Sequence, residues 1–305
     1  MEKNKRDIFV ILGPTGSGKS ACALELAKKI DGEIVNGDSR QIYKILSYGT
    51  CKPKQEQQAS VPHHLYDFLE PHHPYNAGRY AKDAEKIILE ILKREKNPIV
   101  VGGTGLYISA LFDGLAELPE KDESVRAYWL KIANEHGKEA LHNCLKKKDP
   151  EAAEKIPYQN IQRTLRALEV FSLTGKKISF LQKTAPKKNS IFNPLFYGLW
   201  WEKPVLKERL LKRAKEILPG LILETEWLIQ HGFKGHEPAL QSLGYQQTIR
   251  YLNKEIGKEN LLNSLVLDTL HYAKRQITYF KRDHRIHWIK MEEPFNPKTI
   301  LEKML

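Results

Sequence analysis

The residues with the clearest chemical signature are Gly-Pro-Thr-Gly-Ser-Gly-Lys-Ser at positions 13–20, a complete GxxxxGK[ST] phosphate loop. Its glycines let the backbone wrap a diphosphate so that successive N–H groups point at the phosphate oxygens. The lysine adds a positive charge, and the last hydroxyl is a ligand for Mg²⁺, the expected cofactor. We therefore predict a diphosphate site formed by Gly13, Pro14, Thr15, Gly16, Ser17, Gly18, Lys19 and Ser20, with Ser20 also holding the metal.

Two further polar side chains follow short apolar runs of the kind that form buried strands. Asp38 comes shortly after residues 33–36, and Thr104 comes shortly after residues 98–101. In an open parallel sheet, ligands bind at the edge where the strands end. Asp38 at that edge could accept a proton from a nucleophile, and the Thr104 hydroxyl could donate or accept in the same cleft. Each is equally well suited to cap a helix, so both interpretations stay open.

The strand predicted at 98–101 ends in Gly-Gly-Thr. An ATPase or kinase with a phosphate loop usually carries an acidic residue at such a strand end, where it holds Mg²⁺. The pattern therefore favours a diphosphate that departs over a γ-phosphate that is transferred.

Three basic segments could contact phosphate. Arg163 and Arg166 share one helical face, and Arg209 and Arg213 share another. The second pair could neutralise a leaving diphosphate. Residues 272–282 place basic and aromatic side chains on one predicted helix, which suits an RNA backbone and unstacked bases. A solvated charged face explains the first pair equally well, and it is the usual explanation for a charged helix such as 272–282.

Composition narrows the class of protein. The chain has 305 residues, 41% of them hydrophobic, a net charge of +12 and three cysteines. Residues 1–120 are neutral, so the positive excess lies in residues 121–305 and indicates a polyanionic partner. The cysteines form no CxxC pair and fit a reducing cytosol, and no segment is long and apolar enough to span a bilayer. We expect a cytoplasmic protein without a membrane partner.

The elements that must position these residues alternate between strand and helix. We predict strands at 8–12, 33–36, 98–101 and 194–201, and helices at 21–30, 80–95, 106–112, 204–217, 220–231, 239–253, 258–281 and near the C-terminus. Prolines make residues 41–76 loop-rich. Residues 122–183 carry helical patterns without a strong strand signal. The predicted fold is therefore an α/β core, residues 1–118, a helical insertion, residues 119–190, and a return to the core, residues 191–305.

Taken together, these motifs resemble those of the tRNA dimethylallyltransferases. The resemblance covers nearly the whole chain and rests on GPTGSGKS at 13–20, DSRQIYK at 38–44, GTCKP at 49–53, VPHHLYD at 61–67, VGGTGLY at 101–107, QRTLRALEV at 162–170, Gly-Tyr at 244–245 and AKRQIT at 273–278. It implies a P-loop NTPase-like core with an inserted all-helical tRNA-binding domain. The implied activity is transfer of a dimethylallyl group from dimethylallyl diphosphate to N6 of the adenosine 3′ of the anticodon.

The resemblance also assigns roles. It makes Asp38 the base, with Thr15 and Thr104 as further catalytic residues, and it places Arg213 on the diphosphate. It implies a monomer that contacts the anticodon arm of tRNA through Asp38, Ser39, Arg40, Gln41, Thr104, Arg126, Gln162, Arg163, Thr164, Leu165, Arg166, Ser242, Leu243, Gly244, Tyr245, Gln246, Gln247, Lys274, Arg275, Gln276, Ile277, Thr278, Tyr279, Phe280 and Lys281.

Several positions depart from the family pattern, most of them on the RNA-facing side: Asn160, Lys215, Ile217, Gln246, Leu270 and Tyr279. These departures keep a non-catalytic tRNA-binding paralogue as one alternative. The phosphate loop alone also fits a kinase of a small molecule or nucleotide. A prenyltransferase of free adenine nucleotides is a further alternative, which the long basic insertion disfavours.

Overall fold

The computed structural model describes residues 6–185 and 191–305. Within them, residues 6–112 and 191–305 pack into one compact unit, and residues 113–185 pack into a second. The second unit begins at Asp113, six residues before the predicted start of the insertion. In the part of the chain that is described, every helix is too short or too polar to cross a membrane.

The larger unit is built on a six-stranded sheet with the order β3-β2-β4-β1-β5-β6, in which every neighbouring pair is parallel. The strands are β1 Arg6–Leu12, β2 Gly32–Asn36, β3 His63–His64, β4 Asn97–Gly102, β5 Phe192–Trp200 and β6 His287–Lys290. All six therefore end at the same edge of the sheet, and the predicted α/β class is confirmed.

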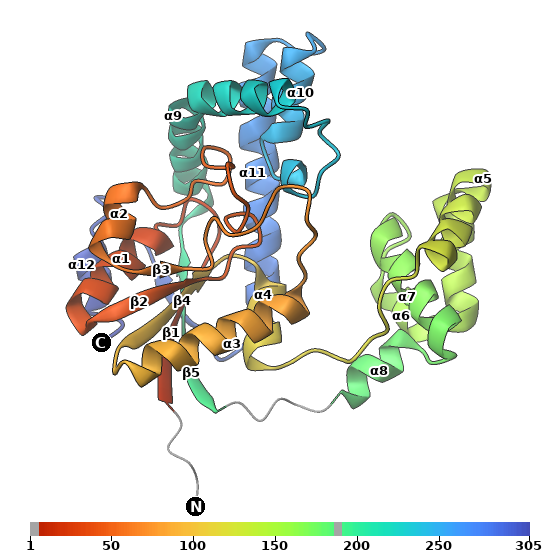
Figure 1. The fold of residues 1–305 in the computed structure, drawn as a ribbon, viewed down its shortest axis with the longest axis horizontal. Helices are drawn as coiled ribbons and strands as arrows, with labels where there is room; N and C mark the ends of the chain where they lie inside the picture. The colour runs from red at the N-terminus through yellow and green to blue at the C-terminus, as the bar shows by residue number, and fades with distance from the viewer. Residues whose placement is uncertain (1–5, 186–190) are drawn as a thin grey trace, which may run out of the picture. The chain divides into compact units, whose positions relative to one another are not determined.

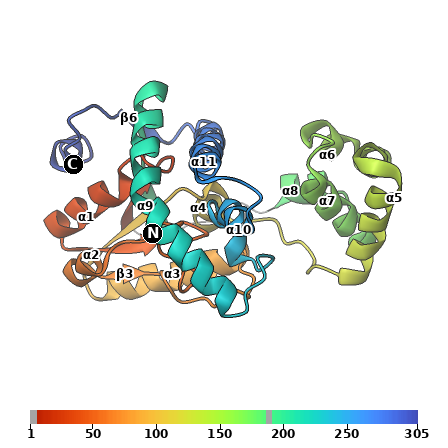
Figure 2. The ribbon, with the colours of Figure 1, turned by 90° about the horizontal axis from the view of Figure 1, so that it is seen from above.

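Helices cover both faces of this sheet (Figures 1 and 2). On one face, side chains of α3 Ala77–Lys93 and α4 Gly105–Phe112 pack against Ile8, Val10 and Leu12 of β1. On the other face, α1 Lys19–Ile30 and α12 Pro297–Leu301 pack against Ile11 and the neighbouring strands. The alternation along β1 follows the two-residue period of a strand that is buried on both sides.

Three more helices form a third apolar cluster: α9 Lys203–Gln230, α10 Tyr245–Leu252 and α11 Lys258–Phe280. The sequence predicts two helices where α9 is one, because Pro219 lies inside it. Leu218 and Leu221 beside the proline are buried in the cluster, so tertiary packing holds the helix together across the missing backbone N–H. The ribbon bends partway along α9 (Figures 1 and 2), as a proline inside a helix produces.

The smaller unit contains α5 Glu123–Lys148, α6 Pro150–Lys155, α7 Ile161–Thr174 and α8 Ile178–Thr184 around its own core. Gly137 breaks α5 with left-handed backbone (φ 85°). The side chains of Asp122, Asp149 and Asn160 cap the helices that follow them. Within residues 113–185 the described structure is helical and without strands.

The remaining differences from the predicted elements are small. Short α2 Gln55–Ser60 and β3 interrupt the predicted loop 41–76, and β6 extends the sheet near the C-terminus. The predicted helix 239–253 divides into a 3₁₀ turn, Ala239–Gln241, and α10, because Gly244 at φ 97° separates them. These elements are too short for a sequence period to define them.

Candidate functional site

The phosphate loop lies between the end of β1 and the start of α1, as predicted. Gly18 caps α1 in left-handed backbone (φ 91°), and a Cβ there would lie 2.7 Å from the Phe295 ring. The Thr15 N–H donates a 3.0 Å hydrogen bond to Gln276 Oε1 of α11. Lys19 Nζ donates to the Pro14 carbonyl at 3.1 Å. The loop is thus held from two distant parts of the chain, with its backbone wrapped toward the helix N-terminus, where anions bind.

Lys19 is half-buried, and desolvation lowers the pKa of its ammonium group to about 8. The nearby Asp38 carboxylate opposes that shift, and the Arg213 guanidinium adds to it. The lysine therefore lies within electrostatic range of both residues. Its charge lacks a carboxylate at hydrogen-bond distance in the described chain, so an anionic ligand would both pair it and raise its pKa.

Asp38 occupies the turn that follows β2. Its backbone N–H donates to Asn36 Oδ1 at 2.9 Å, and its Oδ1 accepts from the Arg40 N–H at 2.8 Å. No helix begins at this turn, so the helix-capping interpretation is wrong; one carboxylate oxygen instead stabilises the turn itself. The other oxygen, Oδ2, has no hydrogen-bond partner among the described residues, and Asp38 lines a large cavity. One carboxylate therefore both fixes its own loop and offers an oxygen to a ligand.

Thr104 fixes the position of the Asp38 loop. Its Oγ1 accepts a 3.0 Å bond from the Ser39 N–H and lies 3.2 Å from Ser39 Oγ. The close approach of the two loops requires Gly102, since a Cβ there would lie 2.1 Å from the Gly37 carbonyl oxygen. Thr104 is absent from the described lining of the cavity. The structure therefore gives it a positioning contact, and its predicted contact with substrate stays a prediction.

The two arginines predicted on the diphosphate differ in their surroundings. Arg209 stacks on Trp201 and Phe295, with 4.2 and 5.2 Å from its Cζ to the ring centroids, and pairs with Glu293. Its charge is already neutralised. Arg213 donates from Nε to Cys51 Sγ at 3.0 Å and lies near Lys19. Its guanidinium has no carboxylate partner among the described residues, so Arg213 is the better placed of the two to bind an anion.

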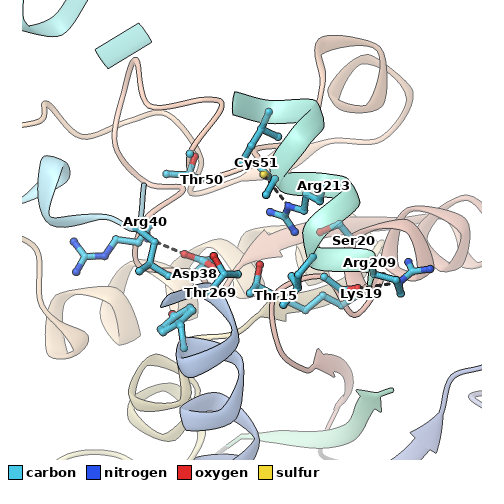
Figure 3. Close-up of a pocket in the computed structure, with 18 of the residues that line it drawn as sticks. Thr15, Lys19, Ser20, Asp38, Arg40, Thr50, Cys51, Arg209, Arg213 and Thr269 are labelled. Atoms are coloured by element: carbon cyan, nitrogen blue, oxygen red, sulfur yellow. Dashed lines mark hydrogen bonds between the residues drawn. The ribbon is translucent and has the colours of Figure 1, made fainter. Parts of the chain in front are cut away.

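One cavity of about 920 Å³ joins these groups, and its described lining belongs wholly to the larger unit. Figure 3 shows Thr15 and Lys19 of the loop segment, Asp38 and Arg213 around one space, with Cys51 beside Arg213. The wall of the cavity combines polar and apolar side chains. The larger apolar and aromatic ones include Tyr66, Val101, Leu210, Leu243 and Leu265. A phosphate cradle, a free carboxylate oxygen and apolar surface are thus available to one ligand.

Several residues predicted to touch tRNA lie inside the protein. Tyr245 is fully buried and donates its hydroxyl to Glu224, and Phe280 is 2% exposed in the core. Gln276 is 5% exposed, and its Nε2 donates to the Gly103 carbonyl at 2.8 Å while its Oε1 accepts from the loop. Direct contact with RNA is therefore wrong for these three side chains, because their polar groups are satisfied or their rings are covered.

Other members of the predicted tRNA set keep accessible positions. Leu243 and Arg275 line the cavity, together with Asp38, Arg40 and Gln41. Ser242 also lines it but is 3% exposed, and its hydroxyl donates to the Ala239 carbonyl. Lys274, Thr278 and Lys281 are exposed on α11, and Gln246 is exposed on α10. Ile277 and Tyr279 are partly buried, and the Tyr279 hydroxyl lies 2.9 Å from Ser109 Oγ. The remaining members make structural contacts. The Ser39 N–H donates to Thr104, and Gln247 accepts from the Gly244 N–H and donates to Asp268.

In the smaller unit, the basic face is partly structural. Arg166 pairs with Glu169, which is fully buried, and donates to the Pro119 carbonyl. Thr164 and Leu165 are each 1% exposed, so their predicted RNA contacts are wrong. Arg126 donates to Gln162, and both are exposed or half-exposed. Arg163 is exposed, with its guanidinium unpaired within the described residues, and it remains the strongest predicted contact of this unit.

Sequence reasoning missed the residues that surround Asp38 and support the loop. Burial and the Asp38 carboxylate raise the pKa values of the Tyr66 and Tyr272 phenols, which places both side chains near that carboxylate. Phe295 and Glu293 support the phosphate loop from the C-terminal segment. Tyr66 lies within the VPHHLYD motif, which was a usable signal. The contacts of Phe295 join distant segments and leave no local pattern.

Comparisons with known proteins identify the family of this chain. The profile of the IPP transferase family matches residues 41–283, and that of isopentenyl transferase matches residues 6–71. The chain is 42% identical over 283 residues to the tRNA dimethylallyltransferase of Carboxydothermus hydrogenoformans, covering 92% of this chain and 91% of the relative. It is 38% identical to that of Acetivibrio thermocellus, covering 98% and 96%.

Solved structures give the same result. The full-length tRNA isopentenylpyrophosphate transferase from Bacillus halodurans superposes with a TM-score of 0.71 at 33% identity, covering 98% of this chain and 95% of that one. A eukaryotic dimethylallyltransferase, solved acting on tRNA, gives a TM-score of 0.78 at 28% identity, with 93% and 74% covered. With a P-loop core, a cavity that joins loop and carboxylate, and relatives of this identity, the chain belongs to the IPP transferase family, the family of the tRNA dimethylallyltransferases.

Proposed function

We propose that this protein transfers a dimethylallyl group from dimethylallyl diphosphate to N6 of the adenosine on the 3′ side of the anticodon in tRNA. In this reaction the bond from C1 of the prenyl group to the diphosphate oxygen breaks, and a bond from C1 to N6 forms. The N6 proton passes to a base, and diphosphate leaves. The relatives named as tRNA dimethylallyltransferases support this assignment.

The observation that carries the proposal is the arrangement of charge in the 920 Å³ cavity. Lys19, Arg213 and the loop amides lie at one part of its wall, where negative charge develops on a departing diphosphate. Asp38 lies within electrostatic range of Lys19 and keeps one oxygen free for the amine proton. β4 ends in Gly102-Gly103-Thr104 without a carboxylate, which favours this chemistry over phosphoryl transfer.

Mg²⁺ would bind at the Ser20 hydroxyl, which lines the cavity. Among the described residues there is no cluster of three His, Cys, Asp or Glu side chains that could bind a metal. This fits Mg²⁺, which keeps several waters and takes most of its other ligands from substrate phosphates. When bound, the ion would stabilise charge on the leaving diphosphate. Ser20 and Lys19 then orient the diphosphate so that C1 faces Asp38.

The adenine must leave its stack to reach Asp38 inside the cavity. This costs little in an anticodon loop, because the base is already unpaired. Ser242, Leu243 and Arg275 line the cavity and would contact the entering nucleotide. The positive excess in residues 121–305, including exposed Arg163, would bind the phosphates of the anticodon arm.

A single assay tests the proposal. The protein is incubated with Mg²⁺, dimethylallyl diphosphate and unmodified tRNA, and the nucleosides are analysed by mass spectrometry after digestion. A dimethylallyl adduct on adenosine is expected. Salt-sensitive tRNA binding without an adduct would instead indicate a non-catalytic paralogue. Phosphate transfer from ATP to a small acceptor would indicate a kinase.

A further inference from the structure

Tyr66 is a large side chain in the wall of the cavity, near Asp38. Tyr66 and Val101 line the main cavity together with Ser20, and the same three residues also line a second, much smaller cavity. They therefore form a partition between the two spaces. Figure 3 shows Ser20 and Asp38 at the main cavity.

The smaller cavity lies on the far side of this partition. Its volume is about 10 Å³, and its other lining includes Ala23, Leu24 and Ile34. A space of that size holds about one water molecule. An isoprene unit has five carbon atoms and is far larger. A prenyl chain that reaches Tyr66 therefore meets a largely apolar end that is too narrow for a further isoprene unit.

The position of the reacting atoms directs the prenyl chain toward this end. With its diphosphate on Lys19 and Ser20, the donor must hold C1 within reach of an amine bound at Asp38. The rest of the main cavity must admit the adenine, so the four remaining carbon atoms of the group need a separate apolar surface. Tyr66 and Val101 supply it next to both anchors.

The Tyr66 ring is held in place by its neighbours. It contacts the His63 ring edge to face, with 5.5 Å between centroids and an interplanar angle of 67°. Burial and the Asp38 carboxylate keep its phenol protonated by raising its pKa. Its hydroxyl has no hydrogen-bond partner within the described residues. The ring itself, and not a polar contact, is therefore what closes the space.

We propose that Tyr66 sets the length of the prenyl donor, limiting it to five carbon atoms by closing the cavity behind the dimethylallyl group. The inference rests on the proposed function, since it assigns the donor pocket of the same reaction. Removing the ring would join the two cavities. Truncating one large apolar side chain in a core has opened a cavity of about 150 Å³ that binds benzene, which is room for a second isoprene unit.

The test is a competition between dimethylallyl and geranyl diphosphate at equal concentration, with unmodified tRNA as acceptor. We expect wild-type protein to form the five-carbon adduct almost exclusively. Tyr66→Ala and Tyr66→Val should raise the ratio of ten-carbon to five-carbon adduct by about tenfold or more, because a pocket discriminates each methylene by about tenfold. Tyr66→Phe retains the ring and should keep the wild-type ratio. Tyr251→Ala, which removes a tyrosine from α10 outside the cavity, is the matched control.

Because the two adducts are compared as a ratio, a loss of activity that affects both donors equally does not change the result. If both truncations abolish turnover, the binding of geranyl diphosphate in the absence of tRNA is measured by calorimetry instead. The truncated proteins should then bind geranyl diphosphate more tightly than wild type does. Ratios and affinities equal to wild type would overturn the proposal, and so would a wild-type protein that already uses both donors equally. Failure of wild type to transfer either group would instead refute the proposed function.

Discussion

Gln276 of α11 offers a quantitative test of how the site is assembled. Its side-chain amide accepts from the Thr15 N–H at 3.0 Å and donates to the Gly103 carbonyl at 2.8 Å, and the residue is 5% exposed. One side chain thus connects the phosphate loop to the segment that follows β4. We predict that Gln276→Met, which has nearly the same shape, leaves the buried Gly103 carbonyl and the part-buried Thr15 N–H without their partner.

The cost follows from the two lost partners. An unsatisfied buried acceptor costs about 1–3 kcal/mol, and the lost bond at the part-buried Thr15 N–H costs about 1 kcal/mol more, so Gln276→Met should lower the free energy of unfolding by about 2–4 kcal/mol. Gln276→Glu keeps an acceptor for Thr15 but places an oxygen against the Gly103 carbonyl. Compared with Gln276→Met, this variant should regain the hydrogen bond to Thr15 but still leave the Gly103 carbonyl without a donor. Gln58→Met, which removes a single hydrogen bond to the Pro53 carbonyl, is the control and should cost about 1 kcal/mol.

Urea unfolding measures the stability, and calorimetry with inorganic pyrophosphate and with tRNA measures the two ligands separately. Because the bridge holds the phosphate loop, the pyrophosphate Kd of Gln276→Met should rise while the tRNA Kd stays within about twofold of wild type. A stability change below about 0.5 kcal/mol, the range of ordinary surface substitutions, would refute the bridging role. Weaker tRNA binding with unchanged pyrophosphate binding would instead restore Gln276 as a tRNA contact.

Four further outcomes are expected. The pKa of Lys19 is lowered to about 8, so the free enzyme loses this positive charge as the pH rises through 8. Pyrophosphate affinity, measured by calorimetry, should then fall about tenfold per pH unit above that value. Lys19→Arg should remove this pH dependence. Asp38→Asn should lower turnover by about 10²–10⁴-fold with tRNA affinity intact, and unchanged turnover would exclude Asp38 as the base. Arg163→Ala should weaken tRNA binding and reduce its salt dependence by about one counterion, while pyrophosphate binding stays constant, and the reverse result would contradict the division of the site. Arg166→Ala removes the charged partner of buried Glu169, which keeps only its hydrogen bond from the Asp122 N–H. The change should destabilise the smaller unit by about 3 kcal/mol, the low end for a buried pair because Arg166 is itself 25% exposed; an unfolding midpoint equal to wild type would show that the pair is dispensable.

The long apolar runs were sufficient to predict the core of the fold. β1, β2, β4 and β5 lie where the sequence places them, within about two residues, because a buried parallel strand bounded by glycine has a distinct pattern. β3 has two residues and β6 has four, and both depend on pairing with a neighbour for their structure. α9 was divided in the prediction because a proline ends a helix unless packing on both sides opposes it.

The site, like the fold, could be predicted only where a local sequence pattern defines it. The phosphate loop and Asp38 are recognisable because their chemistry depends on residue type and local spacing. Gln276 and Tyr245 lie in equally recognisable motifs, yet they are buried and bond to the protein itself. A sequence motif therefore marks these residues as part of the site but does not show whether they contact substrate or the protein itself. Tyr66 acquires its place at the cavity through the fold alone, since His63 and Val101 meet it from separate strands.

The contact between the phosphate loop and the C-terminal segment also bears on biosynthesis. Thr15 is bonded to a residue 261 positions further along the chain, and Gly18 rests against Phe295 beyond that. A ribosome must release nearly the entire polypeptide before the first motif it made can be held in shape.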